Sequence, residues 1–116
     1  MSTRSAIIMK NEFDESYSGI YCHFDGYKNG VGIELFDNYQ DLNKVKDLIA
    51  LGDISSLGDS IKSTVAYHRD RDEELSISHG YSVKQVANQI GHNGYVYLYK
   101  DNKWYINDVI LDFEDI

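Results

Sequence analysis

Reactive and flexible residues are densest between Cys22 and Gly32, where the sequence reads CHFDGYKNGVG. The run holds a thiol, an imidazole, a carboxylate and three glycines. A phosphate-binding loop would need lysine and then serine or threonine directly after its last glycine, whereas Gly32 is followed by isoleucine and glutamate. We therefore interpret the run as a connection from a strand to a helix, with a tight turn at Asp25 and Gly26. A loop that binds a neutral or cationic group is the alternative.

The cysteine and the histidine at the start of this run are not expected to form a catalytic pair. Adjacent side chains on a strand point to opposite faces, so Cys22 should share a face with Ile20 and Phe24 as a buried, inert thiol. The sequence contains no C-x-x-C or H-x-x-x-H spacing, and a predicted helix separates His79 from His92. The spacing therefore predicts no metal site, and nothing in it indicates a cofactor.

The segment YHRDRD at residues 67–72 is the second candidate, because it holds two of the three arginines of an acidic chain. As a strand it would place His68 beside Asp70 on one face and Arg69 beside Arg71 on the other. The first pair suggests acid–base chemistry, although a solvated ladder of charges is the more common outcome. Clustered arginines suit carboxylate and phosphate groups. If a small anionic ligand binds, we expect it at side chains from this segment and from the glycine-containing run, namely His68, Arg69, Arg71, Asp25 and Tyr27.

The tyrosines are the third candidate, because the chain has ten of them. Tyr95, Tyr97 and Tyr99 alternate with Val96 and Leu98, so three tyrosines share one face of a predicted strand. Two interpretations stay open: aromatic packing across the strands of the sheet, or a surface that binds a partner. The second interpretation adds three acidic side chains to the binding surface, namely Asp72, Glu73 and Glu74.

Short strands are expected to position most of these residues. Alternation and β-branched content predict strands at residues 3–10, 17–24, 64–71, 95–100 and 103–107. The polar residues after the first strand indicate a hairpin, and Asp101-Asn102 indicates a two-residue hairpin turn. The tail from Asp108 to Ile116 either adds a last strand to a sheet edge or docks as an acidic segment.

Two helical stretches lie between these strands. Apolar spacing predicts helix over residues 31–51, with a break near residues 38–40, and over residues 82–90. The helix ends carry the usual signals, with N-caps at Asp41 and Ser82 and stops at Gly52 and Gly91. Hairpins at both ends of the sequence imply an α+β fold, an antiparallel sheet with two to three short helices packed on one face.

Length and composition limit the classes of function. The 116 residues contain no proline and no linker-like segment, so we expect residues 1–116 to form a single domain. A net charge of −8 disfavours binding to nucleic acid or to an anionic membrane. One cysteine excludes an intrachain disulfide and favours a reducing, cytoplasmic compartment. The apolar run Ala6–Met9 is too short for a signal peptide or a membrane span.

Several of these segments resemble a family of small proteins encoded by bacteriophages and prophages. The resembling residues are spread over most of the chain: Ser2-Thr3-Arg4-Ser5, Gly19-Ile20-Tyr21, His23, Asp25-Gly26-Tyr27, Gly30-Val31-Gly32, Leu48-Ile49, Gly52-Asp53, Ser55-Ser56-Leu57, Ala66-Tyr67-His68-Arg69-Asp70 and Trp104-Tyr105. In the family a proline often follows the Asp-Gly-Tyr, where this chain has Lys28. The resemblance implies a phage or mobile-element origin and brings no catalytic residue with it. Small acidic phage proteins often inhibit host defence machinery, including CRISPR effectors, by binding it.

These observations favour a non-enzymatic phage protein that binds a host protein or complex, with no direct contact to nucleic acid or membrane. Its acidic, tyrosine-rich surface would meet a basic groove of the partner. The alternative is a binder of a small ligand, such as a nucleotide signal, that uses Arg69, Arg71 and the loop from Asp25 to Gly32. A hydrolase that uses His68 is a third hypothesis, and pairing of open sheet edges would allow a homo-oligomer.

Overall fold

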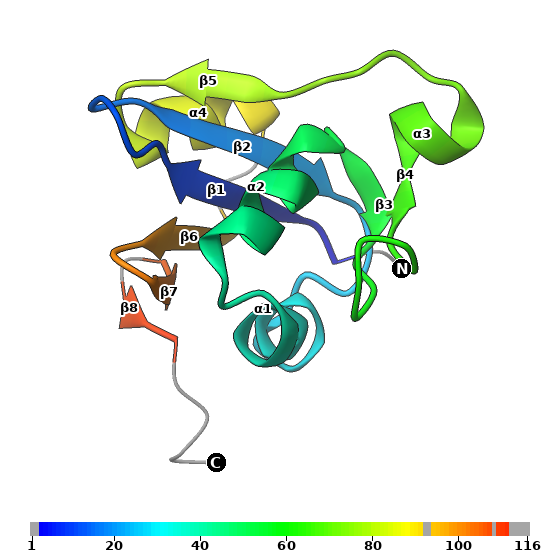
Figure 1. The fold of residues 1–116 in the computed structure, drawn as a ribbon, viewed down its shortest axis with the longest axis horizontal. Coiled ribbons are helices and arrows are strands. Elements are labelled where there is room, and N and C mark those ends of the chain that lie inside the picture. The colour runs from blue at the N-terminus through cyan, green and yellow to red at the C-terminus, as the bar shows by residue number, and fades with distance from the viewer. Residues whose placement is uncertain (1–2, 92–93, 108, 112–116) are drawn as a thin grey trace.

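The computed structural model describes residues 3–91, 94–107 and 109–111 (Figure 1). Eight strands, four helices and one π-helical segment follow in this order: β1 (Ser5–Lys10), β2 (Tyr17–Cys22), the π-helical segment (Lys28–Gly32), α1 (Ile33–Asn38), α2 (Leu42–Ala50), β3 (Ile54–Ser56), β4 (Val65–Ala66), α3 (Tyr67–Arg71), β5 (Ser78–Gly80), α4 (Val83–Ile90), β6 (Tyr95–Lys100), β7 (Lys103–Ile106) and β8 (Val109–Ile110). The tail predicted as a last strand is described only as far as Leu111, and its acidic end lies outside the described residues.

All eight strands belong to one sheet, which has the order β4-β3-β2-β1-β6-β7-β8. β2 pairs with β1 along one side, and on its other side it pairs first with β5 and then, at Cys22, with β3. β1 and β6 run parallel, so the two predicted hairpins, β1–β2 and β6–β7, lie side by side at the centre of the sheet. The α+β class is confirmed, but the sheet is mixed, because a long crossover that contains the helices permits the parallel pair.

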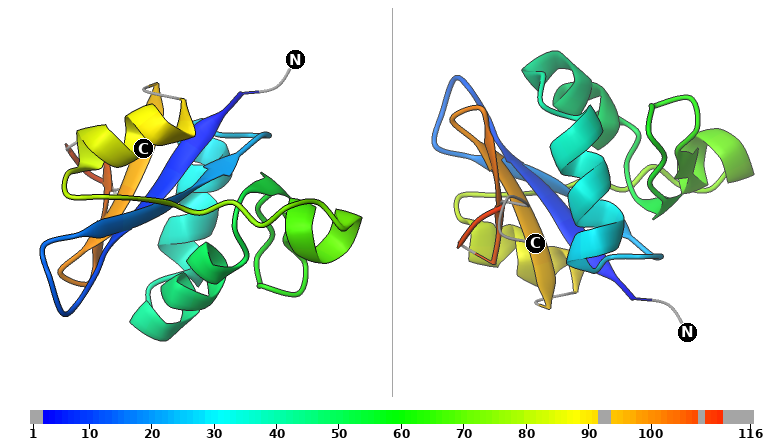
Figure 2. Two further views of the ribbon diagram at one scale, coloured as in Figure 1. Left: turned by 90° about the horizontal axis from the view of Figure 1, so that it is seen from above. Right: turned by 90° about the horizontal axis from the view of Figure 1, so that it is seen from below.

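Helices cover both faces of the sheet, and not one face as the sequence suggested. Ile7 and Met9 point toward α1 and α2, whereas Ala6 and Ile8 point toward α4. Figure 2 shows α4 on one side of the sheet and α1 and α2 on the other. The unbroken apolar run in β1 explains this arrangement, because a strand that is apolar at successive positions must be buried on both faces.

Most local signals are confirmed. Asp41 caps α2 by accepting the N–H of Asn43, and Ser82 caps α4 by accepting the N–H of Gln85. Gly52 and Gly91 end these helices with φ of 77° and 83°. The hairpin turn between β6 and β7 has positive φ at both of its central residues, 54° at Asp101 and 64° at Asn102, as a type I′ turn requires.

The strand predicted for residues 64–71 is wrong beyond its start, because only Val65 and Ala66 extend as β4 before the chain coils into α3. Side chains of α3 turn back onto β4 and replace a neighbouring strand. Asp70 accepts the N–H of Ala66 at 2.8 Å, and Arg69 donates to the carbonyl of Thr64. These local bonds favour a helical turn over a longer strand.

Candidate functional site

The tyrosines predicted as a partner surface lie mostly in the core. Tyr97 is 0% exposed and Tyr99 is buried beneath α1 and α2, where its ring lies 5.1 Å from that of Trp104. Each hydroxyl donates to a backbone carbonyl at 2.7 Å, that of Tyr97 to Gly26 and that of Tyr99 to Gln40. Packing across strands is therefore the correct interpretation for these two residues, and neither ring can reach a partner.

The remaining members of that predicted surface lie closer to solvent. Tyr95 is half-buried at the edge of the same core cluster. Asp72, Glu73 and Glu74 are exposed on the segment that leaves α3, which turns sharply at Asp72 with a φ of 54°. The acidic part of the predicted surface is accessible, whereas of the three tyrosines only Tyr95 is partly so.

The predicted anion site is largely occupied by contacts within the chain. Arg69 forms an ion pair of 2.8 Å with Asp70 and donates to the carbonyl of Ile61 at 2.9 Å. Hydrogen bonds from this guanidinium lower the pKa of the Asp70 carboxyl. His68 contacts the carbonyl of Glu73 through Nδ1 at 2.8 Å, so the structure does not pair His68 with Asp70. Arg69 and His68 are exposed, but these bonds hold them against α3 and the segments beside it, so a ligand would have to compete with these contacts.

The glycine-containing run is a connection from a strand to a helix, as predicted. Asp25 has a φ of 59°, and its carbonyl accepts the N–H of Val31 at 2.7 Å. A Cβ on Gly30 would lie 2.2 Å from the Asp25 carbonyl oxygen, so this position requires glycine. Tyr27 is exposed, and its hydroxyl lies 3.4 Å from the Asp25 carboxylate. Backbone carbonyls accept the N–H groups of Gly26, Gly30, Val31 and Gly32, so the N–H groups of all three glycines of the run are already bonded within the chain.

A different group of side chains does come together at the end of the sheet that holds β3, β4 and α3. The hydroxyl of Tyr21 lies 2.6 Å from Nδ1 of His23, and the His23 ring packs edge-on at 4.5 Å against Phe24. The guanidinium of Arg71 lies over the ring of Tyr67 at 5.3 Å. Burial raises the pKa of Tyr21. The nearby charge of Arg4 partly offsets this rise, and Tyr67 is also close enough to influence the pKa. We name this group the arginine–aromatic patch, and its members are Arg4, Tyr21, His23, Phe24, Tyr67 and Arg71.

Strand pairing and one aspartate assemble the patch. Ser5 pairs with Cys22, which brings the next residues, Arg4 and His23, to neighbouring positions. Asp53 joins the other members, because its carboxylate accepts the N–H of Tyr21 at 2.9 Å and its carbonyl accepts the N–H of Tyr67 at 3.2 Å. Burial raises the pKa of this carboxyl.

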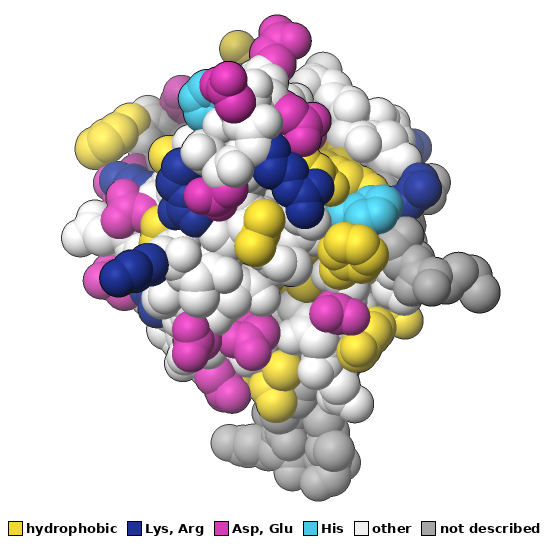
Figure 3. All heavy atoms as spheres, turned by 90° about the vertical axis from the view of Figure 1, so that its right-hand side faces the viewer, with side chains coloured by type: hydrophobic (Ala, Val, Ile, Leu, Met, Phe, Trp, Pro, Cys, Tyr) yellow, Lys and Arg dark blue, Asp and Glu magenta, His cyan; other side chains and the backbone are white. Residues whose placement is uncertain are grey.

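The surface of this end of the molecule differs from the acidic average of the chain. In Figure 3, Lys and Arg side chains and a histidine lie beside hydrophobic side chains, and acidic side chains lie above, below and between them. Arg4, Phe24 and Arg71 are exposed, and the other three members of the patch are half-buried. The patch therefore combines cationic groups with accessible aromatic rings.

The patch brings a hydroxyl group and an imidazole together, but not a thiol. Tyr21 and His23 have the geometry for proton transfer, but the nearest thiol in sequence, Cys22, points to the opposite face. Burial raises the pKa of that thiol to about 12, which makes it a poor nucleophile at neutral pH. Among the described residues no group of three or more His, Cys, Asp or Glu side chains is placed to hold a metal ion.

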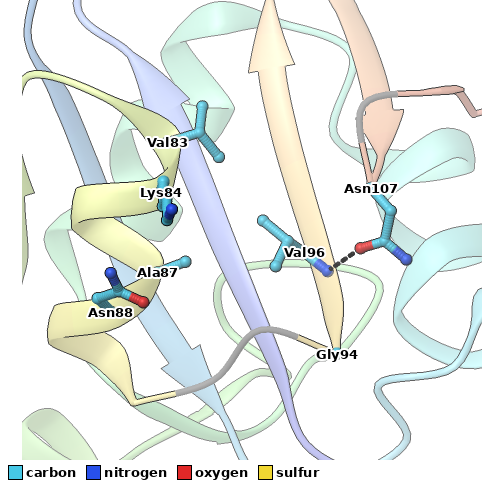
Figure 4. Close-up of a pocket in the computed structure, with 7 residues that line it drawn as sticks. All are labelled: Val83, Lys84, Ala87, Asn88, Gly94, Val96 and Asn107. Atoms are coloured by element: carbon cyan, nitrogen blue, oxygen red, sulfur yellow. Dashed lines mark hydrogen bonds between the residues drawn. The ribbon is translucent and has the colours of Figure 1, made fainter.

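A groove of about 440 Å³ between α4 and β6 is the second candidate (Figure 4). Its lining consists of Val83, Lys84, Ala87, Asn88, Gly94, Val96 and Asn107. The Asn107 side chain already accepts the N–H of Val96 at 2.9 Å. With one charged side chain and several apolar ones, this groove suits an apolar side chain better than a reacting substrate.

Comparison with known proteins does not identify a function for either candidate site. Comparison with models of protein families, with curated proteins and with solved structures finds no match to this chain. The resemblance to phage proteins therefore stays a prediction. Within the described residues, no helix combines the length and the apolar run that a membrane crossing requires.

The sequence analysis did not predict the arginine–aromatic patch, because its members come from segments that lie far apart in the sequence. Alternation along a strand puts Tyr21 and His23 on one face, but Arg4 and Tyr67 reach them only through strand pairing. One signal was available: all three arginines lie near an end of a predicted strand, Arg4 in residues 3–10 and Arg69 and Arg71 in residues 64–71. That signal indicates cationic groups at strand ends but does not show which ends meet.

Proposed function

We propose that this protein is a non-enzymatic binding protein that docks on another protein through the arginine–aromatic patch. The observation that carries the proposal is the exposure of the Arg4 and Arg71 guanidinium groups and their lack of bonding partners within the described ranges. Both side chains are exposed, and neither guanidinium group forms a hydrogen bond or an ion pair with another described residue, although that of Arg71 lies over the ring of Tyr67. Arginine and tyrosine are over-represented among the residues that dominate binding energy at protein interfaces.

The partner surface should be acidic or rich in carbonyl groups at its centre. Guanidinium groups bind carboxylates through two parallel hydrogen bonds, and Phe24, which is 42% exposed, supplies an apolar contact beside them. Nucleic acid fits less well, because the net charge of −8 repels a phosphate backbone outside the patch. The exposed acids Asp72 to Glu74 would lie toward the rim, where they add selectivity for basic groups around the partner's centre.

The resemblance to phage proteins supports a bacterial host protein as the partner. A host defence complex of the CRISPR type is the most specific form of this proposal. In that case the protein would act by occupying a surface of the complex and would need no catalytic group. A homo-oligomer is compatible with the same proposal, because the patch includes no residue of the edge strand β8.

Quantitative capture from a bacterial lysate tests the proposal. Tagged wild-type chain and the variants Phe24→Ala and Arg71→Glu are compared by mass spectrometry of the bound proteins. Lys84→Glu is the matched control, because it changes the net charge equally but lies on α4. Capture of a partner that depends on the patch should fall roughly thirtyfold in each of the two patch variants. This is the loss expected when an interface residue contributes about 2 kcal/mol to binding. Equal capture of every partner by wild type and by both patch variants would refute the proposal.

A small anionic ligand with an aromatic ring is the second candidate. The same two guanidinium groups would bind phosphate, and the exposed ring of Phe24 would stack on a base. Thermal denaturation with a panel of cyclic and linear nucleotides separates the two candidates, since a ligand at about 100 times its Kd stabilises by about 2.7 kcal/mol. A shift that Arg71→Glu abolishes supports the small ligand, and the absence of any shift removes it.

A further inference from the structure

Side chains cover one outer edge of the sheet at β4. An edge strand presents unpaired N–H and C=O groups that would pair with another chain. At β4 the carboxylate of Asp70 accepts the outward N–H of Ala66 at 2.8 Å. The guanidinium of Arg69 donates to the carbonyl of Thr64 and also binds Asp70. This ion pair takes the place of a neighbouring strand.

A second edge, at β5, is covered in the same way by α4. The side-chain amide of Gln89 bonds both groups of His79, accepting its N–H at 3.2 Å and donating to its carbonyl. One turn earlier on the helix, Gln85 accepts the N–H of Tyr81 at 2.6 Å. Two glutamines spaced by four residues thus occupy the outer side of β5.

The edge at β8 lacks such a cover among the described residues. The N–H of Leu111 donates to the carbonyl of Trp104 at 3.0 Å, so Leu111 faces β7. Peptide groups alternate along a strand, and the N–H and C=O of Ile110 therefore point away from β7. No described strand pairs with that side, and no hydrogen bond joins it to a described side chain. Val109 is 65% exposed and Ile110 is 55% exposed.

We propose that β8 is a docking edge that takes up an extended segment of a partner protein by strand addition. Main-chain hydrogen bonds to the outward N–H and C=O of Ile110, which bond no other described residue, would supply affinity, as in other cases of strand addition. Ile110 pairs with Tyr105, which in turn pairs with Leu98, so these three side chains form an apolar row across β6, β7 and β8. The residue that an added strand places opposite Ile110 should therefore be aliphatic.

Charge selects the kind of segment that fits. In the sequence, Asp108 and Asp112 flank the strand on its two sides, and Glu114 and Asp115 follow. Two copies of β8 paired antiparallel would place acids opposite acids, which disfavours self-pairing. An aliphatic run between lysines or arginines would be complementary at both ends. The proposed occupant is therefore a basic-flanked aliphatic strand of another protein, and this edge is separate from the arginine–aromatic patch.

A labelled peptide tests the edge directly. The probe is KKVIVKK with blocked termini, its binding to the full chain is followed by fluorescence anisotropy, and EEVIVEE is the charge control. Ile110→Pro removes the outward N–H and leaves the β7–β8 bonds of Val109 and Leu111 intact. Ile110→Thr is the matched variant, because it retains the N–H and a β-branched side chain.

We expect saturable binding of KKVIVKK to the wild-type chain, weakened by about tenfold in Ile110→Pro and by less than about threefold in Ile110→Thr. The acidic peptide should bind at least about tenfold more weakly. A KKVIVKK peptide N-methylated at two consecutive residues, which blocks both of its edges, should lose binding to the unaltered chain. This last measurement holds even if Ile110→Pro does not fold.

Four results would overturn the inference. They are no saturable binding of KKVIVKK to the wild-type chain, full binding of the N-methylated peptide, equal binding of the acidic peptide, and a concentration-dependent dimer that Ile110→Pro abolishes. The last result would make a second copy the occupant. Arg71→Glu should leave peptide binding unchanged, so failure of the proposed function and failure of this inference are distinguishable.

Discussion

The hydroxyl group of Tyr97 provides the most direct test of the buried tyrosine face. This hydroxyl is fully buried and donates to the carbonyl of Gly26 at 2.7 Å. The bond joins the central strand β6 to the loop that follows β2, at a separation of 71 positions. Tyr97→Phe removes one oxygen atom and leaves the ring in place, so it tests the hydrogen bonding of this hydroxyl without changing the packing of the ring.

The expected cost follows from what the substitution leaves behind. A typical intramolecular hydrogen bond contributes about 1 kcal/mol net, and a buried acceptor left without a partner costs about 1–3 kcal/mol. Because Gly26 is itself buried, water cannot easily replace the lost donor. We expect Tyr97→Phe to lower the free energy of unfolding by about 1–3 kcal/mol, a large share of the roughly 5–15 kcal/mol of a small domain.

Urea unfolding followed by circular dichroism measures this difference, and a thermal midpoint lowered by about 4 °C per kcal/mol is the parallel readout. Tyr105→Phe is the control, because Tyr105 is half-buried on the opposite face and its hydroxyl bonds no described residue. The control should change the free energy of unfolding by less than about 0.5 kcal/mol. If Tyr97→Phe costs no more than the control, or if it abolishes partner capture while stability is unchanged, the assignment of Tyr97 to the core is wrong.

Two further substitutions test a buried acid and a covered edge. Burial raises the pKa of Asp53 above 3.8, so the folded chain holds that proton more strongly and the free energy of unfolding should fall as pH rises from that value. Asp53→Asn keeps an acceptor for the N–H of Tyr21 and should flatten this decline in urea unfolding between about pH 4 and 7; an unchanged slope would contradict the reasoning. Gln89→Leu should uncover β5 and produce concentration-dependent association in light scattering. Asn88→Leu is the control, because it adds the same side chain one position earlier on α4. If both variants associate equally, surface hydrophobicity and not the uncovered edge causes the association.

Elements governed by short-range chemistry could be predicted from the sequence. The caps at Asp41 and Ser82 satisfy N–H groups two or three residues away, and both occur as expected. The turn at Asp101-Asn102 requires positive φ at adjacent residues, which asparagine and aspartate tolerate. Each of these signals and its structural consequence lie within a few residues of each other.

The tyrosine face was ambiguous because alternation does not say how many faces are covered. Val96 and Leu98 can fill one face of the strand, so the sequence leaves open whether the tyrosines on the other face pack within the sheet or bind a partner. In the structure β6 lies between β1 and β7, and both of its faces contact apolar residues. Tyr97 and Tyr99 face the larger core cluster, while Val96 lines the groove beside α4. When helices cover both sides of a central strand, neither face of the strand is exposed to solvent, so polar atoms do not mark an outer face.

The arginine–aromatic patch required knowledge of pairing between distant segments. β2 meets β3 through a single parallel pair, Cys22 with Ile54, and that contact places Asp53 beside Tyr21. No local property of either segment encodes this pairing. The same limit explains α3, where Asp70 and Arg69 were interpreted as free charges but instead bond the edge of β4.

The two proposed surfaces differ in charge and lie at different ends of the sheet, with α3 and β8 well separated in Figure 1. The arginine–aromatic patch offers guanidinium groups to an acidic partner, whereas β8 is flanked by acids and favours a basic one. A partner that engaged both surfaces would need opposite charges at two separate places, which makes the combination more selective than either surface alone. Because the sites share no residue, the losses in binding energy from Arg71→Glu and Ile110→Pro should add for such a partner, and each should act alone if two different partners bind.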